Sequence, residues 1–424
     1  RFDIDESGMG FVVPFDRRLI MDVHIPPGES KDATPGDMVT VEITKWPTAA
    51  RGPLGRVVEV LGGIDEPGVD TEIILRKYGI LAEHGEEAVE EARRLGTTVK
   101  ERDLKGRTDF RQDVTVTIDG EHARDFDDAI TLDRLENGNY WLGVHIADVA
   151  HYVPEGSALD EEGYDRATSV YFPERAVHMF PSELATGLCS LNPQVDRLVQ
   201  SCLMEIDTKG SVARYELHDG VIHSNARMTY TDVNAILTDR DPELLAKYAE
   251  LVPLFERMRD LFVILNKRRH RRGSIDFDLK EPEIVLDDEG MVEAITALER
   301  NVAHRLIEEF MLVANETVAQ HLDDHGVPSL FRVHEEPDPL KVEEFEEFVA
   351  TLGYSLGAPS DGIKPRHFQK LVEKMRGTPE EKPIAFLMLR TMQKARYDPQ
   401  NRGHFGLAAK SYTHFTSPIR LYPE

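Results

Sequence analysis

Four aspartates crowd into one short stretch of this chain, directly after a run of β-forming residues. The run covers residues 114–117, and residues 117–130 read Thr-Ile-Asp-Gly-Glu-His-Ala-Arg-Asp-Phe-Asp-Asp-Ala-Ile. The aspartates are Asp119, Asp125, Asp127 and Asp128. Carboxylates held a few ångströms apart raise one another's pKa and destabilise a fold, unless a divalent cation compensates them or they project into water. A strand followed by Asp-x-Asp-Asp favours the cation, and it is typical of oxygen-ligand Mg²⁺ sites in enzymes of phosphoryl transfer.

The N-terminal region is expected to form a small β-barrel of the oligonucleotide-binding (OB) type, over residues 1–62. Four short runs with alternating or β-branched residues, separated by turn signals, predict its strands at residues 10–14, 19–25, 38–43 and 55–61. Phe11 lies in the first run. An exposed aromatic there would suit stacking on nucleic-acid bases, but Phe11 could equally belong to the barrel core, and the pattern does not decide between the two.

The rest of the chain reads as a helical linker followed by one large α+β domain. Residues 82–95 form a charged, alanine-containing helical pattern, so we expect a linker over residues 63–104. From residue 105 onward strands and helices alternate. A strand is predicted at 142–147, and helices are predicted at 242–271, 302–322, 341–352 and 365–376. The fold class is therefore α+β, with the larger domain spanning residues 105–424.

Composition excludes several classes of protein. The chain has 424 residues, 41% of them hydrophobic, which is enough for two or three packed domains. No apolar run is long enough to cross a membrane, and we expect no membrane partner. The two cysteines, Cys189 and Cys202, provide no disulfide framework and favour a reducing, cytoplasmic setting with both thiols buried. Because the first residue is not Met, the sequence is expected to be a fragment of a longer protein.

A net charge of −27 argues against non-specific binding of polyphosphates, since that affinity comes from Lys and Arg. An enzyme that admits a strand through a channel can nevertheless be acidic outside and basic along the path. The densest basic segment is 267–272, Lys-Arg-Arg-His-Arg-Arg. It can be a solvated helix C-terminus, where cations meet the negative end of the helix dipole, or part of an RNA path. Both interpretations stay open.

Further motifs give the acidic segment a context. In order along the chain they are Ala-Thr-Ser-Val-Tyr-Phe-Pro at 167–173, Gly-Leu-Cys-Ser-Leu-Asn-Pro at 187–193, His-Arg-Leu-Ile-Glu-Glu-Phe-Met at 304–311, Asn-Arg-Gly-His-Phe-Gly-Leu at 401–407 and His-Phe-Thr-Ser-Pro-Ile-Arg at 414–420. With these motifs in this order, the chain resembles the ribonuclease II / ribonuclease R family of exoribonucleases, and it is more similar to the ribonuclease R branch. The resemblance extends from the barrel to residue 420. It implies an N-terminal cold-shock-like OB barrel followed by an RNB catalytic domain.

The resemblance also implies roles for particular residues. Asp119, Asp125, Asp127 and Asp128 match the magnesium-site carboxylates of the family, which hold Mg²⁺, two ions in the expected mechanism, with Mn²⁺ as an alternative. Arg420 matches the arginine that faces the scissile phosphate. Two metals would activate the attacking water and stabilise the leaving 3′-oxygen, while a guanidinium can hold phosphoryl oxygens in a bidentate manner. The alternative for Arg420 is a structural arginine paired with an acid.

Four more residues match positions that contact RNA in the family. Tyr171 matches the tyrosine that stacks at the 3′ end, and Phe277 is the candidate for the second half of that clamp; an aromatic face accepts any base. Tyr230 and Glu308 resemble the positions that grip the terminal ribose, where contact with the 2′-hydroxyl would distinguish RNA from DNA. The neighbouring Glu309 points about 100° away on a helix, so only one of the two glutamates can face the site.

Two histidines could in principle take part in catalysis. His404 and His414 could serve as general bases, but a metal-activated water makes such a base unnecessary, so structural roles are expected for both.

Leu421 stands where the family usually has a second arginine. The last helices of the catalytic domain and the S1 barrel typical of the family do not follow residue 424, so the catalytic domain is expected to be C-terminally incomplete.

The expected function is therefore processive hydrolysis of single-stranded RNA from its 3′ end, by a monomer that releases nucleoside 5′-monophosphates. Two other functions stay open at this point. One is an RNA-binding or regulatory member of the same family with an impaired nuclease, which the missing C-terminal part and Leu421 suggest. The other is a metal-dependent phosphoesterase that acts on small molecules, which the barrel and the stacking aromatics oppose.

Overall fold

The computed structural model describes residues 1–276, 281–297, 299–357 and 362–424. These residues divide into two compact units. The first contains Arg1–His84, Val170–Val177 and Pro282–Thr296, and the second contains Gly85–Ser169, His178–Glu281 and Ala297–Glu424. Phe277 lies outside the described residues, so its predicted place in a stacking clamp stays a prediction.

The first unit is built on a five-stranded sheet with the order β1-β2-β3-β5-β4. Its strands are β1 (Phe2–Ile4), β2 (Gly10–Val12), β3 (Val23–Ile25), β4 (Asp37–Lys45) and β5 (Leu54–Gly63). The backbone N–H of Gly36 donates to Phe2 O (2.9 Å), which ties the start of β4 back to β1 and closes the sheet. Gly55 allows close packing, since a Cβ there would lie 2.5 Å from Val41 Cγ1.

The predicted strands of this sheet are present, with two corrections. Strand β1 was not predicted, although Phe2 is one of the largest fully buried side chains. The predicted strand at 19–25 is shorter, because residues 19–21 are exposed and only Val23–Ile25 is extended against its neighbours. Phe11 is half-buried and lies outside the buried cluster of Phe2, Val12, Val23, Ile25 and Val57.

The predicted linker contains more than one helix. Helix α1 (Val69–Tyr78) ends at Gly79 in a left-handed conformation, which only glycine adopts without strain. Helix α2 (Glu86–Leu95) buries Ala88 and Ala92 on one face, and a 3₁₀ turn, η1 (Glu101–Leu104), follows it. The first of these helices belongs to the first unit and the other elements to the second.

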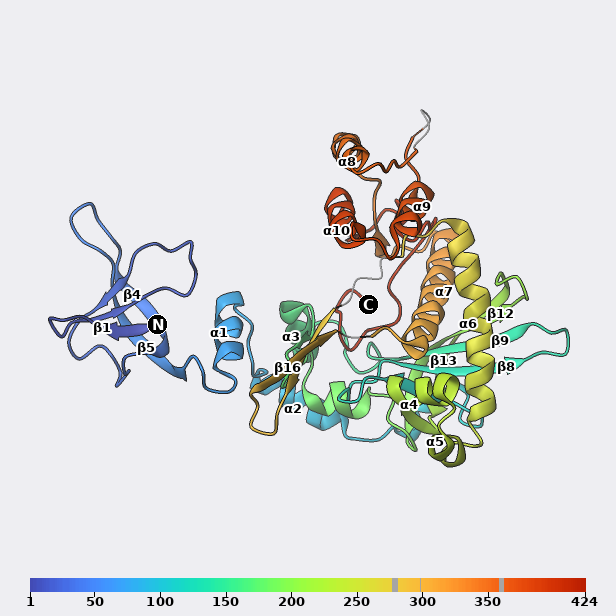
Figure 1. Ribbon diagram of the computed structural model, residues 1–424. Coiled ribbons are helices and arrows are strands. Elements are labelled where there is room, and N and C mark those ends of the chain that lie inside the picture. Colours follow the sequence, from blue (N-terminus) through green and yellow to red (C-terminus); the bar gives the residue numbers. More distant parts are fainter. Residues whose placement is uncertain (277–280, 298, 358–361) are drawn as a thin grey trace. The chain divides into compact units, whose positions relative to one another are not determined.

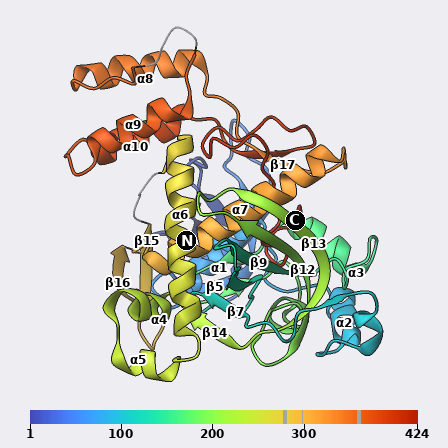
Figure 2. The same ribbon diagram turned by 90° about the vertical axis from the view of Figure 1, so that its right-hand side faces the viewer.

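A seven-stranded sheet with the order β14-β7-β8-β9-β12-β13-β6 forms the centre of the second unit (Figures 1 and 2). Its strands are β6 (Thr108–Asp109), β7 (Val116–Asp119), β8 (Asp128–Arg134), β9 (Tyr140–Ala147), β12 (Asp196–Ile206), β13 (Val212–His223) and β14 (Ala226–Thr229). Pairing is antiparallel in the middle of the sheet and parallel at its two outermost pairs, β14 with β7 and β13 with β6. The predicted strand at 142–147 lies within β9.

Helices cover both faces of this sheet. One face packs against α4 (Tyr230–Asn234), α6 (Val252–Arg272) and α7 (Val302–Asp324), with Phe255 and Phe310 fully buried. The opposite face packs against α2, α3 (Ala158–Arg166) and the π-type turn η2 (Glu183–Leu188), with Leu159 and Met179 fully buried. Cys202 lies in the first of these cores and Cys189 in the second; both are free and buried, as predicted.

The long helix predicted at 242–271 is two helices, α5 (Pro242–Lys247) and α6, separated by a short turn. Asp241 caps α5 through its side chain, and Pro253 stands in the first turn of α6, where its missing N–H costs no helical hydrogen bond. A second π-type turn, η3 (Ala235–Asp239), precedes α5. None of the described helices is long and apolar enough to span a membrane.

Three further helices form a small group with its own apolar core. They are α8 (Pro339–Thr351), α9 (Pro365–Met375) and α10 (Glu381–Thr391), and Phe345, Phe368 and Met388 are buried among them. The helices predicted at 341–352 and 365–376 correspond to the first two. Three two-stranded pairs complete the fold: β10 (Val170–Tyr171) with β11 (Ala176–Val177), β15 (Pro282–Leu286) with β16 (Val292–Ala297), and β17 (Phe331–Val333) with β18 (Arg396–Asp398).

Candidate active site

The four aspartates lie at one end of the strand pair β7 and β8. Asp119 is the last residue of β7, Asp128 is the first residue of β8, and Asp125 and Asp127 lie in the loop between them. Because the two strands are antiparallel neighbours, the end of one and the start of the other lie at the same edge of the sheet. The local sequence therefore brings all four carboxylates together by folding one tight loop.

The Cys-Ser-Leu-Asn-Pro motif holds this loop in shape. Ser190 accepts a hydrogen bond from the N–H of Phe126 (3.0 Å) through Oγ and donates one to the carbonyl of Arg124 (2.8 Å). The N–H of Leu191 donates to the Phe126 carbonyl (2.9 Å). On the other side, Arg227 donates to the carbonyl of Gly120 (2.6 Å). The motif thus holds the backbone of the acidic loop in place. The spacing of residues in the sequence does not reveal this role.

Arg420 reaches the aspartates from the far end of the chain. The N–H of Ile419 donates to Asp127 Oδ1 (2.8 Å), and the carbonyl of Arg420 accepts from the N–H of Ser169 (2.9 Å). The guanidinium then lies among three carboxylates: its Nε is 3.0 Å from Asp127 Oδ2 and 3.4 Å from Asp125 Oδ2, and its Nη2 is 3.9 Å from Asp119 Oδ1. The structure therefore brings all five residues of the predicted catalytic set together.

The carboxylates are strongly desolvated. Asp119, Asp125 and Asp127 are buried, with at most 5% of their surface exposed. Burial, followed by the charge of Asp128, raises the pKa of Asp119 to about 8. Burial raises the pKa of Asp128 to about 6, with Arg420 offsetting part of the effect, and it raises the pKa of Asp127 well above its usual value. One guanidinium does not balance four carboxylates, so ionisation of the whole cluster near pH 7 requires a further positive charge.

This donor set fits a hard divalent cation. Asp119 Oδ2 and Asp128 Oδ2 are buried, and no described group gives either oxygen a hydrogen bond. Buried acceptors without partners are costly unless something else occupies their lone pairs, and Mg²⁺ takes carboxylate oxygens as its usual protein ligands. In the described part of the chain, however, no three His, Cys, Asp or Glu side chains already enclose a common ion position. The carboxylates are gathered around Arg420 and do not form a closed cage.

Tyr230 lies next to the acidic cluster. Strand β14 pairs in parallel with β7, and Thr229 is opposite Asp119, so Tyr230 begins α4 just beyond the end of β7. Its ring stacks on His304 of α7, with centroids 3.9 Å apart. Burial, followed by the charges of Asp128 and Asp119, raises the pKa of Tyr230, so its hydroxyl stays protonated and can donate a hydrogen bond.

The structure separates Glu308 from Glu309, as the helical geometry required. Glu309 is buried, and its Oε1 accepts hydrogen bonds from Arg269 Nε (2.7 Å) and Asn266 Nδ2 (2.9 Å). Glu308 lies one turn after His304 on α7, with 36% of its side chain exposed, and Arg300 donates to its Oε2. Glu309 is therefore satisfied inside the protein, while Glu308 is the glutamate that can meet a ligand.

One residue near the site carries no sequence signal. His178 Nδ1 lies 3.8 Å from Asp125 Oδ2. Burial lowers the pKa of His178, so the imidazole is neutral near pH 7. His178 precedes η2 in a segment, Arg-Ala-Val-His-Met-Phe, that matches no motif, and only its spatial neighbours reveal it.

Tyr171, His404 and His414 remain of the residues considered in the sequence. Tyr171 is on β10 in the first unit, and half of its surface is exposed. His404 and His414 belong to a cluster of rings with Tyr412, with centroids 5.2 Å and 5.7 Å from that of Tyr412. Burial lowers the pKa of His404 to about 3, so it is a poor proton acceptor. The structural roles expected for the two histidines fit this packing.

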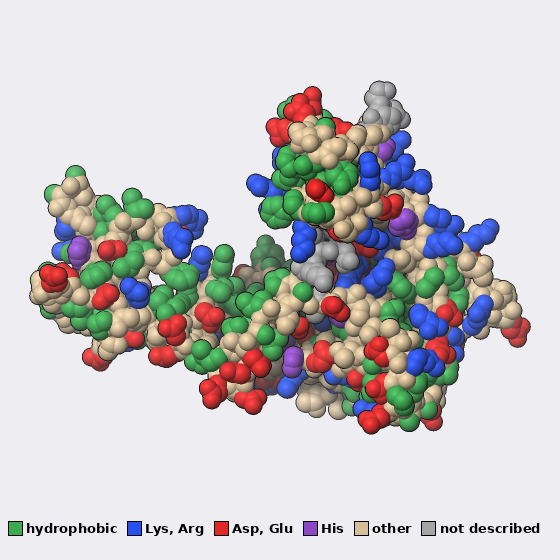
Figure 3. All heavy atoms as spheres, in the orientation of Figure 1, with side chains coloured by type: hydrophobic (Ala, Val, Ile, Leu, Met, Phe, Trp, Pro, Cys, Tyr) green, Lys and Arg blue, Asp and Glu red, His purple; other side chains and the backbone are tan. Residues whose placement is uncertain are grey.

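The basic segment 267–272 forms the last turns of α6. Arg269 and Arg272 turn inward, where Arg269 binds Glu309 and Arg272 binds Glu316 with two hydrogen bonds of 2.6 Å. Lys and Arg side chains gather over α6 in the view of Figure 3. The segment therefore lies at a helix C-terminus, where two of its four arginines bind glutamates, and a place on the RNA path stays a prediction for this segment.

Comparison with known proteins identifies the architecture. Residues 107–424 match the RNB domain, and residues 11–84 match the cold shock domain. The chain is 42% identical to Ribonuclease R 1 of Lactococcus lactis, over 99% of this chain and 52% of that protein. It is 44% identical to Ribonuclease R of Thermotoga maritima, over 99% of this chain and 59% of that protein. The chain thus spans a little over half the length of these curated relatives.

Solved structures agree with this comparison. The apo form of Mycoplasma genitalium RNase R has a TM-score of 0.90 at 29% identity, over 99% of this chain and 66% of that one. The structure of yeast Ssd1, described as a pseudonuclease, has a TM-score of 0.73 at 20% identity over 100% of this chain and 53% of that one, which shows a shared fold alone. These matches confirm the predicted α+β fold class and the resemblance to ribonuclease R. The chain belongs to the RNB-domain family.

Proposed function

We propose that this chain carries the catalytic centre of a hydrolytic exoribonuclease that degrades single-stranded RNA from its 3′ end to nucleoside 5′-monophosphates. The observation that carries the proposal is the meeting of Asp119, Asp125, Asp127 and Asp128 with Arg420 at one edge of the sheet. Relatives named Ribonuclease R support it, as do solved structures of M. genitalium RNase R with double-stranded RNA and with ribose-methylated single-stranded RNA.

The four aspartates would hold Mg²⁺, two ions in the proposed mechanism, with Mn²⁺ as an alternative. When bound, the metal supplies Lewis acidity to the phosphate and to the attacking water. The chain contributes the ligands and their rigidity. Asp127 is oriented by the Ile419 N–H, and the backbone around Asp125 is held by Ser190. Side chains fixed in this way need little reorganisation when the substrate enters, which is the main source of electrostatic catalysis.

Arg420 is proposed to orient the scissile phosphate. Its backbone is held on both sides, by the Ile419 bond to Asp127 and by the Ser169 bond to its carbonyl, so the side chain leaves a fixed point. One third of the side chain is exposed (34%) and could contact a ligand, while Nε is buried and Nη2 donates to the Asp125 carbonyl (3.1 Å). A planar guanidinium can donate two parallel hydrogen bonds to phosphoryl oxygens as their charge increases in the transition state.

Tyr230 and Glu308 are proposed to recognise the terminal ribose, and Tyr171 and Phe277 to stack on bases. A protonated Tyr230 hydroxyl and a Glu308 carboxylate together can donate to and accept from ribose hydroxyls, which deoxyribose offers only in part. Stacking is tolerant of base identity, so the proposed enzyme digests RNA of any sequence. We further infer that the protein is a monomer. We also infer that it acts in the reducing cytoplasm, and the two free buried cysteines support that setting.

The test is a digest of a single-stranded oligoribonucleotide labelled at its 5′ end, with Mg²⁺ and then with EDTA, resolved to single nucleotides. The expected result is a ladder that shortens from the 3′ end only with the metal, together with release of nucleoside 5′-monophosphates. Internal fragments, or release that EDTA does not stop, would contradict the proposal. Competition by poly(A) against a small phosphodiester separates this function from that of a small-molecule phosphoesterase.

The alternative function is RNA binding without hydrolysis. The shared fold with a pseudonuclease shows that the architecture does not require activity, and Leu421 replaces an arginine usual in the family. The complete set of four aspartates with Arg420 favours an active site. If the oligonucleotide binds tightly in Mg²⁺ but stays intact, the alternative holds.

A further inference from the structure

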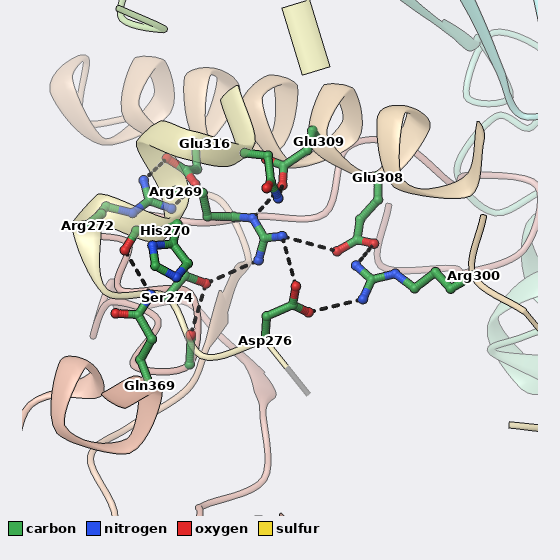
Figure 4. A network of polar contacts seen from close by, with 12 residues as sticks. Arg269, His270, Arg272, Ser274, Asp276, Arg300, Glu308, Glu309, Glu316 and Gln369 are labelled. Atoms are coloured by element: carbon green, nitrogen blue, oxygen red, sulfur yellow. Dashed lines mark hydrogen bonds and ion pairs between the residues drawn. The ribbon is translucent and has the colours of Figure 1, made fainter. Parts of the chain in front are cut away.

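Five charged side chains meet beside the first turns of α7 (Figure 4). They come from three segments: the end of α6, the residues that follow it, and α7 with the residues that precede it. The five are Arg269, Asp276, Arg300, Glu308 and Glu309. Glu308 and Glu309 were considered for ribose contact, whereas the role of Arg300 does not follow from any motif.

Arg300 joins two carboxylates through separate nitrogens. Its Nη1 donates to Asp276 Oδ1 (3.0 Å), and its Nη2 donates to Glu308 Oε2. Burial alone would raise the pKa of Asp276, but Arg269 and Arg300 lower it below its usual value, so the carboxylate stays ionised and keeps its hold on Arg300. The planar fork of an arginine suits this bridge, because its donors diverge at fixed angles.

The far end of the network is rigid. Arg269 Nη2 lies 3.7 Å from Asp276 Oδ2, and Arg269 is itself bound to Glu309, with only 8% and 4% of the two side chains exposed. Glu308 is much more accessible than Arg269 and Glu309, with 36% of its side chain exposed. An isolated exposed ion pair contributes little, since ordering two long side chains costs entropy. Here Arg300 also binds Asp276. Its pairing with Glu308 therefore costs less side-chain conformational entropy than pairing with an isolated arginine would.

Among the residues that the structure describes, none gives a hydrogen bond to one oxygen of Glu308. Oε2 is occupied by Arg300, while Oε1 is 4.0 Å from Arg269 Nη2, which is too long for a hydrogen bond. Oε1 can therefore accept a hydrogen bond from a hydroxyl of the ligand. His304, one turn earlier on the same face of α7, stacks on Tyr230 beside the aspartates. Glu308 thus lies on the same face of α7 as His304, one turn further along the helix.

We propose that Arg300 is a positioning residue that sets the preference for ribose over deoxyribose, by fixing Glu308 so that its Oε1 faces the terminal 2′-hydroxyl. This inference rests on the function proposed above and deepens it. Arg300 does not touch the substrate. Its removal should leave phosphate hydrolysis intact and impair only the part of the reaction that depends on a well-placed Glu308.

The experiment compares two oligonucleotides that differ only at the 3′-terminal sugar, ribose or 2′-deoxyribose. The rate of release of the first nucleotide gives kcat and KM for each. For wild type, the ribose substrate should be preferred by about tenfold or more, the effect of one hydrogen bond to a charged group. Arg300→Gln should lower kcat/KM for the ribose substrate by about fivefold to tenfold and change the deoxyribose value by less than about twofold. Glu308→Ala should reduce the preference for the ribose substrate over the deoxyribose substrate at least as much as Arg300→Gln does.

The double variant and the conservative variant separate positioning from mere stability. Because both residues act through one contact, Arg300→Gln combined with Glu308→Ala should match Glu308→Ala within about twofold. Arg300→Lys keeps the charge but cannot bridge both carboxylates as well, so its ribose preference should be intermediate. Arg396→Gln is the matched control: Arg396 also bridges two carboxylates, those of Asp398 and Glu335, and its loss should leave the preference unchanged.

Equal loss of kcat/KM on both substrates in Arg300→Gln would overturn the inference, and so would an additive double variant. If Arg300→Gln does not fold, as judged by its thermal unfolding, Arg300→Lys decides: a wild-type preference overturns the inference and a reduced one supports it. The proposed function fails separately, because wild type would then release no nucleotide from either oligonucleotide with Mg²⁺.

Discussion

Asp119→Asn should make the second unit more stable in metal-free buffer, and the gain should grow with pH. Asp119 has a native pKa of about 8, against an ordinary value of 3.8. Between these two values the native state binds a proton that the unfolded state has released, so the free energy of unfolding of wild type falls as the pH rises. A neutral amide removes this penalty.

The size of the effect follows from the shift. Each pKa unit corresponds to about 1.4 kcal/mol, so the wild-type penalty at about pH 8 reaches an upper value of roughly 5 kcal/mol. Near pH 4 the carboxyl is protonated in the native state, and the two proteins should differ little. Other groups titrate in the opposite sense: burial lowers the pKa of His145 to about 3, which destabilises the fold in acid. Such groups contribute equally to variant and wild type, so their effect cancels in the difference between the two free energies of unfolding.

The assay can report on the second unit alone. The chain has two tryptophans, an exposed Trp46 in the first unit and Trp141 on β9 of the second. Urea unfolding followed by Trp141 fluorescence, with Trp46→Phe in every protein and EDTA in the buffer, gives the free energies at both pH values. Asp133→Asn, an exposed aspartate of β8, is the control and should show no such growth.

A difference between Asp119→Asn and wild type that does not increase with pH would refute the electrostatic description of the cluster. Addition of Mg²⁺ at about pH 8 provides a second check. A cation that binds only the native state stabilises it by mass action, so wild type should gain stability and Asp119→Asn should gain clearly less. Equal gains in both proteins would mean that Asp119 is not a ligand.

Three other substitutions test the site. Asp127→Asn keeps an oxygen for the Ile419 N–H but removes a charge, so kcat should fall by at least about 10²- to 10³-fold while RNA affinity, measured by filter binding, changes little; parallel losses of both would contradict this division of roles. Arg420→Lys replaces a planar fork with a point charge and should lower kcat by about 10²-fold with KM nearly unchanged, which a full steady-state analysis would check. Ser190→Ala removes both side-chain bonds to the acidic loop, including that from Phe126, and should cost about 1–3 kcal/mol in urea unfolding together with part of the activity.

Much of the site could be predicted from the sequence because its signals are local. The acidic loop lies within a few residues of a strand, and Arg420 lies in a motif of its own. The resemblance assigned Glu308, but residue spacing alone does not separate it from Glu309, since both lie in one motif; in the structure Arg269 packs against the buried Glu309 and leaves Glu308 more exposed. His178 and Arg300 gave no signal: His178 is close to Asp125 only through the fold, and Arg300 lies outside the quoted motifs, eight residues before the Glu308 that it binds.

The fold shows the same division. Period and turn residues predicted four strands of the small sheet and three of the helices after residue 300, but neither β1, which is too short to show a pattern, nor α10. The split between α5 and α6 was missed because both halves have helical spacing, although Pro253 marks the new start. Tyr171 illustrates a further limit: a motif can suggest what a side chain does, while its place in the fold depends on pairing with β11.

The bond from the Ile419 N–H to Asp127 joins residues 292 positions apart. It has a consequence for the order of events during synthesis. The acidic loop is translated well before Arg420 and can fold with its strands, but it lacks its arginine until residue 420 has emerged. In the proposed nuclease, hydrolysis of RNA near the nascent chain, its own message included, would therefore have to wait until both parts of the site have been made.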